Sequence, residues 1–175
     1  MNIRKATSQD LDAVAQIYGD IHTEIEAGRL SVGWIRSIYP TIRTAEAALE
    51  RDDLFVAEDG GEIVGAAIIN RRQEEAYAGA AWNYAAPPER VMVLHTLVIA
   101  PKHFGKGFGP RFVEYYEDYA RSHGCSVLRL DTNVINLRAK AMYIRLGYTA
   151  VEAVPCDFNG LPNNRLLLLE KDLTV

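Results

Sequence analysis

Cysteine is scarce in this chain: only Cys125 and Cys156 occur among 175 residues. They form no metal-ligand spacing with the four histidines, so we expect two reduced thiols and no metal site. The chain also lacks an apolar run of the ~18 residues that a membrane span needs. Arg4 and Lys5 are followed by polar residues, which argues against a signal peptide. These absences favour a cytoplasmic protein with no membrane partner.

An excess of basic residues is missing too. The chain has 19 Lys and Arg against 23 Asp and Glu, a formal net charge of −4. A general nucleic-acid binder needs a basic face, so we expect no nucleic-acid partner. A weakly acidic surface would suit a cationic amine, although it is also ordinary for a soluble protein. With no repeat, low-complexity tract or linker, the length predicts a single domain over residues 1–175.

The hydrophobic periodicity predicts an α/β fold. Strands are expected at 1–6, 54–58, 62–70, 90–100, 127–132, 148–155 and 164–170. Helices are expected after a cap at Thr7 or Ser8, from a cap at Thr44 to Arg51, from the glycines at 105–109 to His123, and over 136–146. Residues 59–61 predict an antiparallel hairpin, whereas the strand–helix–strand crossovers require parallel neighbours. A mixed central sheet with helices on both faces follows.

The most informative stretch runs from His95 to Gly109, where a strand leads into three alternating glycines and then a helix. Glycines at 105, 107 and 109 allow the backbone to turn its N–H groups inward, and the helix directs its positive end to the same point. This pattern predicts a pyrophosphate site, although glycines alone also occur in structural turns. A Walker A loop would need Ser or Thr after Lys106, and a Rossmann loop would follow the first strand of its unit.

The chain resembles the GNAT-superfamily N-acetyltransferases over essentially its whole length. The family loop, Arg/Gln-x-x-Gly-x-Gly/Ala after Leu-x-Val-x-Pro, is matched by Leu97, Ile99, Pro101, Gly107 and Gly109. The chain departs from it at Phe104, where the family has Arg or Gln. A second family signature is matched downstream by Asn136, Ala139, Tyr143, Gly147 and Tyr148.

The resemblance implies a GNAT acyl-CoA N-acyltransferase fold and acetyl-CoA as cosubstrate. Backbone groups of the strand at Leu97, Val98 and Ile99 would bind the acetyl carbonyl and the pantetheine arm. The remaining cofactor-binding residues would be Phe104, Gly105, Lys106, Gly107, Phe108, Gly109, Asn136 and Tyr143. The phenol of Tyr143 would also protonate the departing thiolate.

The group that removes a proton from the amine is less well defined. His95 lies two residues before Leu97, so regular strand alternation predicts that both lie on one face, near the thioester. Its titration near neutrality suits a proton acceptor, and GNAT enzymes that acetylate arylalkylamines carry a histidine at this strand position. The alternative is that a chain of water molecules removes the proton and that His95 only packs in the core. His22, His103 and His123 are interpreted as surface residues.

The family architecture assigns the acceptor site to the first helical pair and to the loop before the central strand. The substrate-binding candidates are Glu24, Trp34, Tyr39, Trp82 and Tyr84. The resulting hypothesis is transfer of acetyl from acetyl-CoA to a primary amine of a small molecule or peptide, by direct attack in a ternary complex. Alternatives are another short acyl-CoA as donor, or a non-catalytic acyl-CoA-binding sensor. The sequence leaves a homodimer open.

Overall fold

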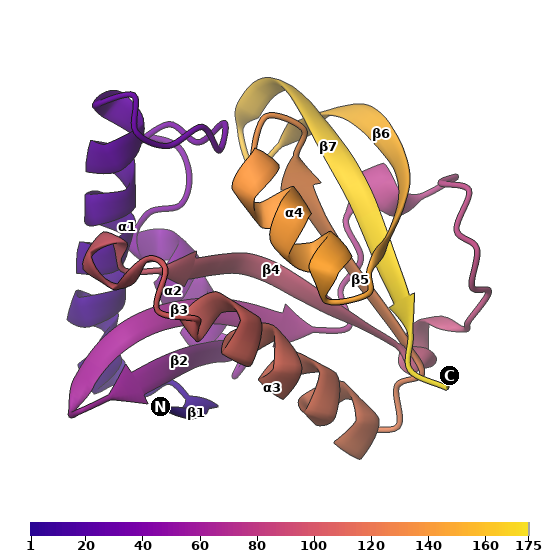
Figure 1. Cartoon of the computed structure of the whole chain (residues 1–175), viewed down its shortest axis with the longest axis horizontal. Helices are drawn as coiled ribbons and strands as arrows, with labels where there is room; N and C mark the ends of the chain where they lie inside the picture. Colours follow the sequence, from indigo (N-terminus) through magenta and orange to yellow (C-terminus); the bar gives the residue numbers. More distant parts are fainter. Residues whose placement is uncertain (175) are drawn as a thin grey trace.

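A computed structural model describes residues 1–174; residue 175, the last of the predicted domain, lies outside the described residues. Its centre is a seven-stranded sheet in the order β1-β2-β3-β4-β5-β7-β6 (Figure 1). The strands are β1 (Asn2–Lys5), β2 (Leu54–Asp59), β3 (Glu62–Asn70), β4 (Val91–Ile99), β5 (Val127–Asn133), β6 (Thr149–Phe158) and β7 (Leu161–Asp172). The α-helices are α1 (Leu11–Glu26), α2 (Ile42–Glu50), α3 (Phe108–Ser122) and α4 (Leu137–Arg145).

The strand pairing confirms the predicted mixed sheet. β2 and β3 form an antiparallel hairpin, and Gly60 and Gly61 at its turn have φ values of 61° and 82°, which favour glycine. β4 and β5 are parallel, joined by the α3 crossover, whereas the other neighbouring strands are antiparallel.

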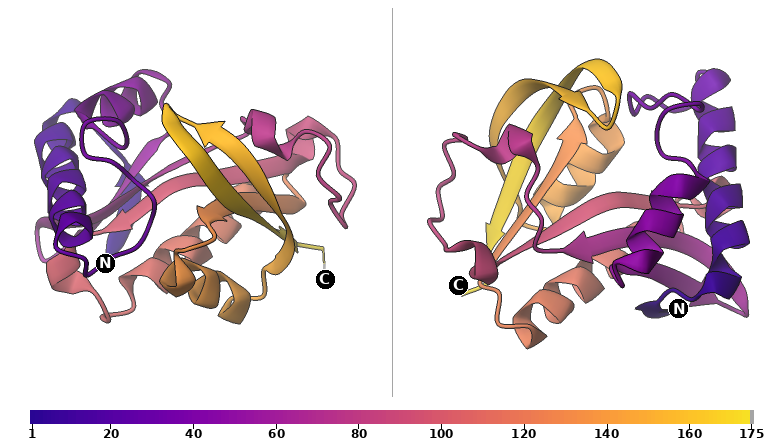
Figure 2. Two further views of the ribbon diagram at one scale, coloured as in Figure 1. Left: turned by 90° about the horizontal axis from the view of Figure 1, so that it is seen from above. Right: turned by 180° about the vertical axis from the view of Figure 1, so that it is seen from behind.

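Helices cover both faces, as predicted (Figure 2). On one face, α3 and α4 bury an aromatic and aliphatic core against β2–β5, with Phe112 and Tyr116 fully enclosed. On the other face, α1 and α2 pack on β2 and β3 through residues such as Val14, Ile17 and Tyr18. Burial on both faces explains why the central strands are continuously apolar rather than alternating.

One of the two predicted helix caps agrees with the structure, and the other does not. Thr7 precedes the first helical segment, and its backbone N–H donates to the Asp10 carboxylate at 2.7 Å. The prediction of Thr44 as the cap of α2 is wrong: Thr41 is the cap, and Thr44 accepts a hydrogen bond from the Thr41 N–H from inside the helix at 3.0 Å. A helix boundary read from one threonine can slip by a turn, because both residues of a reciprocal capping box can be threonine.

The parallel pairing of β4 with β5 is short. It runs from Val91 opposite Val127 to Leu94 opposite Leu130 and extends no further. Beyond that point the two strands diverge, with β4 running toward α1 and β5 toward the β6–β7 hairpin (Figure 1). The gap between residues 95–99 and 131–133 leaves one backbone edge of β4 without a strand partner.

A β-bulge changes the side-chain alternation of β4 at the start of this gap. Ala66 lies opposite Val98 and Ile68 opposite His95, so β4 contains one residue more than β3 over this stretch. Thr96 occupies the bulge with a φ of 50°, which is rare for a β-branched residue. Its hydroxyl is hydrogen-bonded to the hydroxyl of Tyr39, which ties the bulge to the segment before α2.

No helix in residues 1–174 combines the length and the apolar character that a membrane crossing requires.

The junction between β1 and α1 provides a test of the fold. Arg4 donates to both carboxylate oxygens of the buried Asp10, at 2.8 and 2.9 Å. The Arg4 hydrogen bond lowers the pKa of Asp10 to about 2. Because this folded-state pKa is below the unfolded value of ~3.9, the stabilisation is present at neutral pH and is lost as the pH falls from about 4 toward 2.

We therefore expect Asp10→Asn to lower the free energy of unfolding by about 1–2 kcal/mol at pH 7 in urea titrations. The difference from wild type should shrink below pH 4. Asp12→Asn, at an exposed position of the same helix, should have a much smaller effect. A difference for Asp10→Asn that stays constant down to pH 2 would contradict the ion-pair explanation.

Candidate active site

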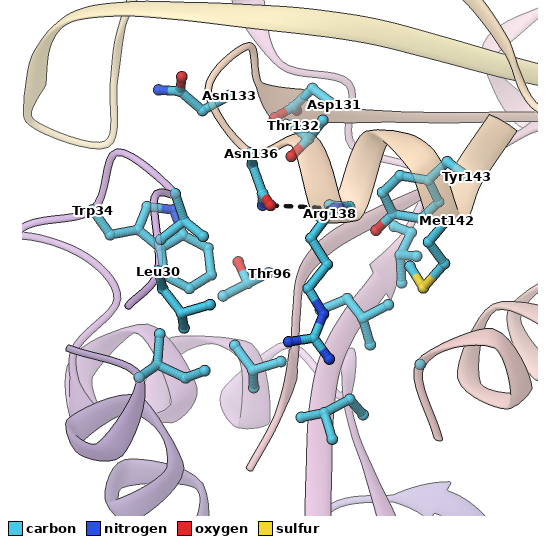
Figure 3. Close-up of a pocket in the computed structure, with 18 of the residues that line it drawn as sticks. Leu30, Trp34, Thr96, Asp131, Thr132, Asn133, Asn136, Arg138, Met142 and Tyr143 are labelled. Carbon is cyan, nitrogen blue, oxygen red and sulfur yellow. Dashed lines mark hydrogen bonds between the residues drawn. The ribbon is translucent and has the colours of Figure 1, made fainter. Parts of the chain in front are cut away.

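The divergence of β4 and β5 opens a pocket of about 350 Å³ (Figure 3). Its walls come from residues 94–99 of β4 and residues 131–133 of β5, with α4 on one side and the segment around Trp34 on the other. The glycine loop at 105–109 forms its outer end. Two segments that the sequence nominated separately, the loop and α4, therefore line a single cavity.

The glycine loop has free donors. Among the described residues, the backbone N–H groups of Gly105, Gly107, Phe108 and Gly109 donate to no protein acceptor. Gly107 caps α3 in the left-handed region, with a φ of 80°. These orphan donors meet the positive end of a 15-residue helix, which is the arrangement that binds phosphate groups. Lys106 points elsewhere: its Nζ lies 3.1 Å from Nδ1 of His103, and it does not line the pocket.

The downstream signature lies on α4. Asn136 caps this helix by accepting a hydrogen bond from the Ala139 N–H at 3.2 Å. About two turns after Asn136, Tyr143 is 5% exposed, and its hydroxyl faces the pocket (Figure 3). Burial raises the pKa of Tyr143, with a smaller contribution from the Asp131 carboxylate. The phenol therefore keeps its proton at neutral pH and is available as an acid.

Asp131 lines the inner end of the pocket, at the first position of β5 beyond the parallel pairing. The Tyr77 hydroxyl donates to its carboxylate at 2.8 Å. Burial raises the pKa of Asp131 to about 6, although the Tyr77 hydrogen bond and the nearby His95 lower it. A carboxylate with this pKa can accept a proton near neutral pH.

His95 lines the pocket, but the regular alternation that predicted His95 and Leu97 on one face of the strand is wrong. Leu94 and Leu97 pack in the same core under α3 and α4, so the bulge at Thr96 shifts the alternation by one residue. His95 therefore lies on the opposite face from Leu97. Its Nε2 is 3.1 Å from the carbonyl oxygen of Arg72, and its Nδ1 is 3.3 Å from the Glu74 carboxylate. Both ring nitrogens of His95 therefore have a protein partner on the side of residues 72–74.

Of the remaining three histidines, which the sequence suggested to be surface residues, two are not exposed. His22 is buried on α1, with Nε2 3.0 Å from the carbonyl oxygen of Pro40. His103 is half-buried beside the glycine loop, and His123 is exposed as predicted. In the part of the chain that the structure describes, no cluster of His, Cys, Asp or Glu could hold a metal ion.

Two of the five substrate-binding candidates line the pocket. Trp34 and Tyr39 contact each other edge to face, with ring centroids 6.0 Å apart. Glu24 is instead ion-paired with Arg29 at 2.7 Å outside the pocket wall.

Trp82 and Tyr84 also lie outside the pocket wall, because the loop at 73–88 is held by contacts with Arg129 of β5 and Glu170 of β7. The Arg129 guanidinium lies 4.2 Å from the Trp82 ring centroid and donates to the Tyr84 carbonyl oxygen at 3.3 Å. The fully buried Glu170 accepts hydrogen bonds from the backbone and side chain of Asn83. The two aromatic residues pack against the sheet and do not line the pocket.

Sequence reasoning did not nominate Asp131 as a site residue. The signal was an acidic residue at the carboxyl end of a strand that is otherwise apolar, beside the glycine loop of the neighbouring parallel strand. In open α/β sheets, ligands bind outside the carboxyl ends of such strands.

The model of the acetyltransferase (GNAT) family matches residues 12–148. The chain belongs to the GNAT acetyltransferase family. The fold of a GNAT acetyltransferase from Streptococcus agalactiae 2603 covers 98% of this chain and 94% of its own length, with a TM-score of 0.80 at 20% identity. The uncharacterized N-acetyltransferase YhfO of Bacillus subtilis (strain 168) is 24% identical over 148 residues, which are 85% of this chain and 89% of YhfO.

A further structure, of the putative acetyltransferase yncA from Salmonella typhimurium with its cofactor acetyl-CoA, has a TM-score of 0.68 at 19% identity. It covers 99% of this chain and 94% of its own length. As a member of the GNAT acetyltransferase family, this protein is an acyltransferase that uses acetyl-CoA. The free N–H groups of its glycine loop fit a pyrophosphate, and the open edge of β4 fits a pantetheine arm.

The glycine loop can be tested with a matched pair of glycines. Gly107 and Gly79 have φ values of 80° and 82°, and a Cβ built on either meets no atom within 4 Å. Gly107 lines the pocket, whereas Gly79 lies outside it, in the loop at 73–88. Alanine should strain both positions by about 1–2 kcal/mol, but only at 107 would the Cβ occupy space that the ligand needs.

We expect Gly107→Ala to weaken CoA binding at least ~10-fold in calorimetry, because the methyl group keeps the pyrophosphate from the N–H groups. Gly79→Ala should bind CoA within about twofold of wild type while losing similar stability. Equal CoA affinities in the two variants would place the pyrophosphate elsewhere.

Proposed function

We propose that this GNAT protein transfers the acetyl group of acetyl-CoA to a primary amine of a small molecule or a peptide, by direct attack in a ternary complex. The observation that carries the proposal is the continuity of the pocket. The free donors of the glycine loop, the Tyr143 hydroxyl and the Asp131 carboxylate line a single cavity. An anionic cosubstrate and a cationic amine would therefore be bound at opposite ends of one site.

Asp131, rather than His95, is the proposed proton acceptor. An alkylammonium group has a pKa of ~10 and cannot attack until it loses a proton. The Asp131 carboxylate attracts this cation, and loss of water around the amine in the pocket favours its neutral form. The proton moves from the amine nitrogen to the carboxylate, directly or through one water molecule, and the Tyr77 hydrogen bond holds the carboxylate in place.

The other groups act on the thioester. Acetyl-CoA supplies an activated acetyl group, and its carbonyl oxygen gains negative charge during attack. The N–H groups of Leu97 and Ile99 point to the unpaired side of β4, since Ala100 N–H donates to Val64 of β3 and the directions alternate. They can stabilise that charge, while the Tyr143 hydroxyl protonates the departing sulfur.

The acceptor end of the pocket indicates what the amine carries. Leu30, Val32 and Trp34 line the pocket, and Leu30 and Trp34 lie across it from Arg138 and Tyr143 of α4 (Figure 3). We infer an amine with an apolar part next to the reacting nitrogen. We further propose that residues 1–175 act as one domain in the cytoplasm and that acetyl is the acyl group transferred. If the protein forms a homodimer, each chain would still contain its own complete site.

A panel of primary amines with acetyl-CoA, read by release of free thiol, tests the proposed function. We expect turnover of at least one amine, with apolar amines ahead of polyamines and amino acids. Tight binding of acetyl-CoA without turnover of any amine would instead indicate a non-catalytic sensor. Faster turnover with a longer acyl-CoA would overturn the choice of acetyl.

The assignment of Asp131 predicts a specific pH dependence. In wild type, kcat/KM should rise with pH through an apparent pKa of about 6, as the Asp131 carboxyl deprotonates. Asp131→Asn should lower kcat about 10²-fold and remove this rise, because no carboxylate remains to accept the proton.

His95→Gln is the matched comparison. The pairing between β4 and β5 ends at Leu94 and Leu130, and His95 and Asp131 are the next residues on the two strands. The rise should persist in His95→Gln. If it disappears there and survives in Asp131→Asn, His95 is the base. If it shifts with the pKa of the amine in every variant, deprotonation occurs before binding.

Tyr143 and Tyr148 provide a second matched pair, with ring centroids 5.7 Å apart. Tyr143→Phe should lower kcat ~10²-fold and change CoA affinity by less than about threefold, because only the proton donor is removed. Tyr148→Phe, whose hydroxyl is buried away from the pocket, should keep wild-type turnover in the same thiol-release assay. Equal losses of binding and turnover in Tyr143→Phe would mean that the hydroxyl only supports the fold.

A further inference from the structure

Phe104 occupies the position at which this chain departs from the family loop pattern. It directly precedes Gly105, and its side chain lines the pocket while packing partly against the α1 core. A phenyl ring has no N–H group, so it cannot provide the hydrogen bonds of the family's Arg or Gln. What the ring does offer is a flat surface that attracts a cation.

A cation does lie on this ring. The Arg138 guanidinium carbon is 4.1 Å from the Phe104 ring centroid. Arg138 comes from the first turn of α4, on the wall of the cleft that faces the glycine loop, and its side chain extends into the pocket (Figure 3). Within residues 1–174 it forms no ion pair with a carboxylate. Its charge and its donors are therefore available to a ligand.

The position of this guanidinium defines the ligand group that it can reach. Through Phe104 it sits beside the loop whose N–H groups are free, and both line the same pocket. Arginine presents planar paired donors that match phosphate oxygens, and its charge does not depend on pH. Among the described Lys and Arg side chains, only Arg145 also lines the pocket, two turns further along α4.

We propose that Arg138 binds the pyrophosphate of acetyl-CoA from the α4 side of the cleft, with its guanidinium positioned by the Phe104 ring. The donor that the family places on the loop is in this chain supplied from the opposite wall. Backbone N–H groups and a guanidinium then hold the pyrophosphate from two sides. The inference concerns the cosubstrate alone and does not depend on the identity of the amine or of the base.

Calorimetric titration with CoA and with 3′-dephospho-CoA tests this assignment. Arg138→Ala should weaken binding of both ligands about 10-fold, because both contain the pyrophosphate. Lys140→Ala removes the same charge from the exposed side of the same helix, outside the pocket. It should bind both ligands within about twofold of wild type.

The double variant Arg138→Ala/Phe104→Arg provides the rescue. It restores a guanidinium from the loop side, so CoA affinity should return to within about threefold of wild type. Thermal unfolding confirms that each variant is folded before titration. Unchanged CoA affinity in Arg138→Ala, with a changed KM for the amine, would overturn the proposal and place Arg138 in the acceptor site. A loss seen with CoA but not with 3′-dephospho-CoA would overturn it in favour of the 3′-phosphate.

Discussion

The site depends on the point at which β4 and β5 stop sharing hydrogen bonds. Parallel pairing ends at Leu94 and Leu130, and from there each strand keeps only its outer neighbour, β3 or β7. An unpaired backbone edge inside a protein must find another partner. The diverging strands therefore create the pocket and also leave β4 with N–H groups for a ligand. The same divergence places Asp131 at the narrow end of that pocket.

Charge is distributed along the pocket in the way that a two-substrate reaction requires. The outer end is positive, with free N–H groups at the start of α3 and the Arg138 guanidinium on Phe104. The inner end holds the Asp131 carboxylate. In the proposed reaction, the anionic cosubstrate would bind at the N–H groups and the guanidinium, and a cationic amine at the carboxylate; the Tyr143 hydroxyl faces the same pocket (Figure 3).

The parts of this arrangement that follow from local sequence could be predicted, and those that follow from distant contacts could not. The mixed sheet, the glycine loop and Tyr143 on α4 were accessible, because hydrophobic period and residue spacing determine them. The bulge at Thr96 depends on pairing with β3, and it places His95 on the opposite face of β4 from Leu97. Trp82 was assigned to the substrate because nothing nearby in sequence indicates that Arg129, from another strand, binds it.

Hydrogen–deuterium exchange with and without acetyl-CoA tests the central claim, that the open edge of β4 and the glycine loop together bind the cosubstrate. We expect slower exchange on binding for the amides of Leu97 and Ile99 and for those of Gly105, Gly107, Phe108 and Gly109, since ligand oxygens would accept from N–H groups that have no protein partner. Exchange in the loop at 73–88 and in the β2–β3 turn, which contribute no residue to the pocket wall, should not change. Protection confined to the loop at 73–88 or to that turn, with no change in β4, would contradict the account.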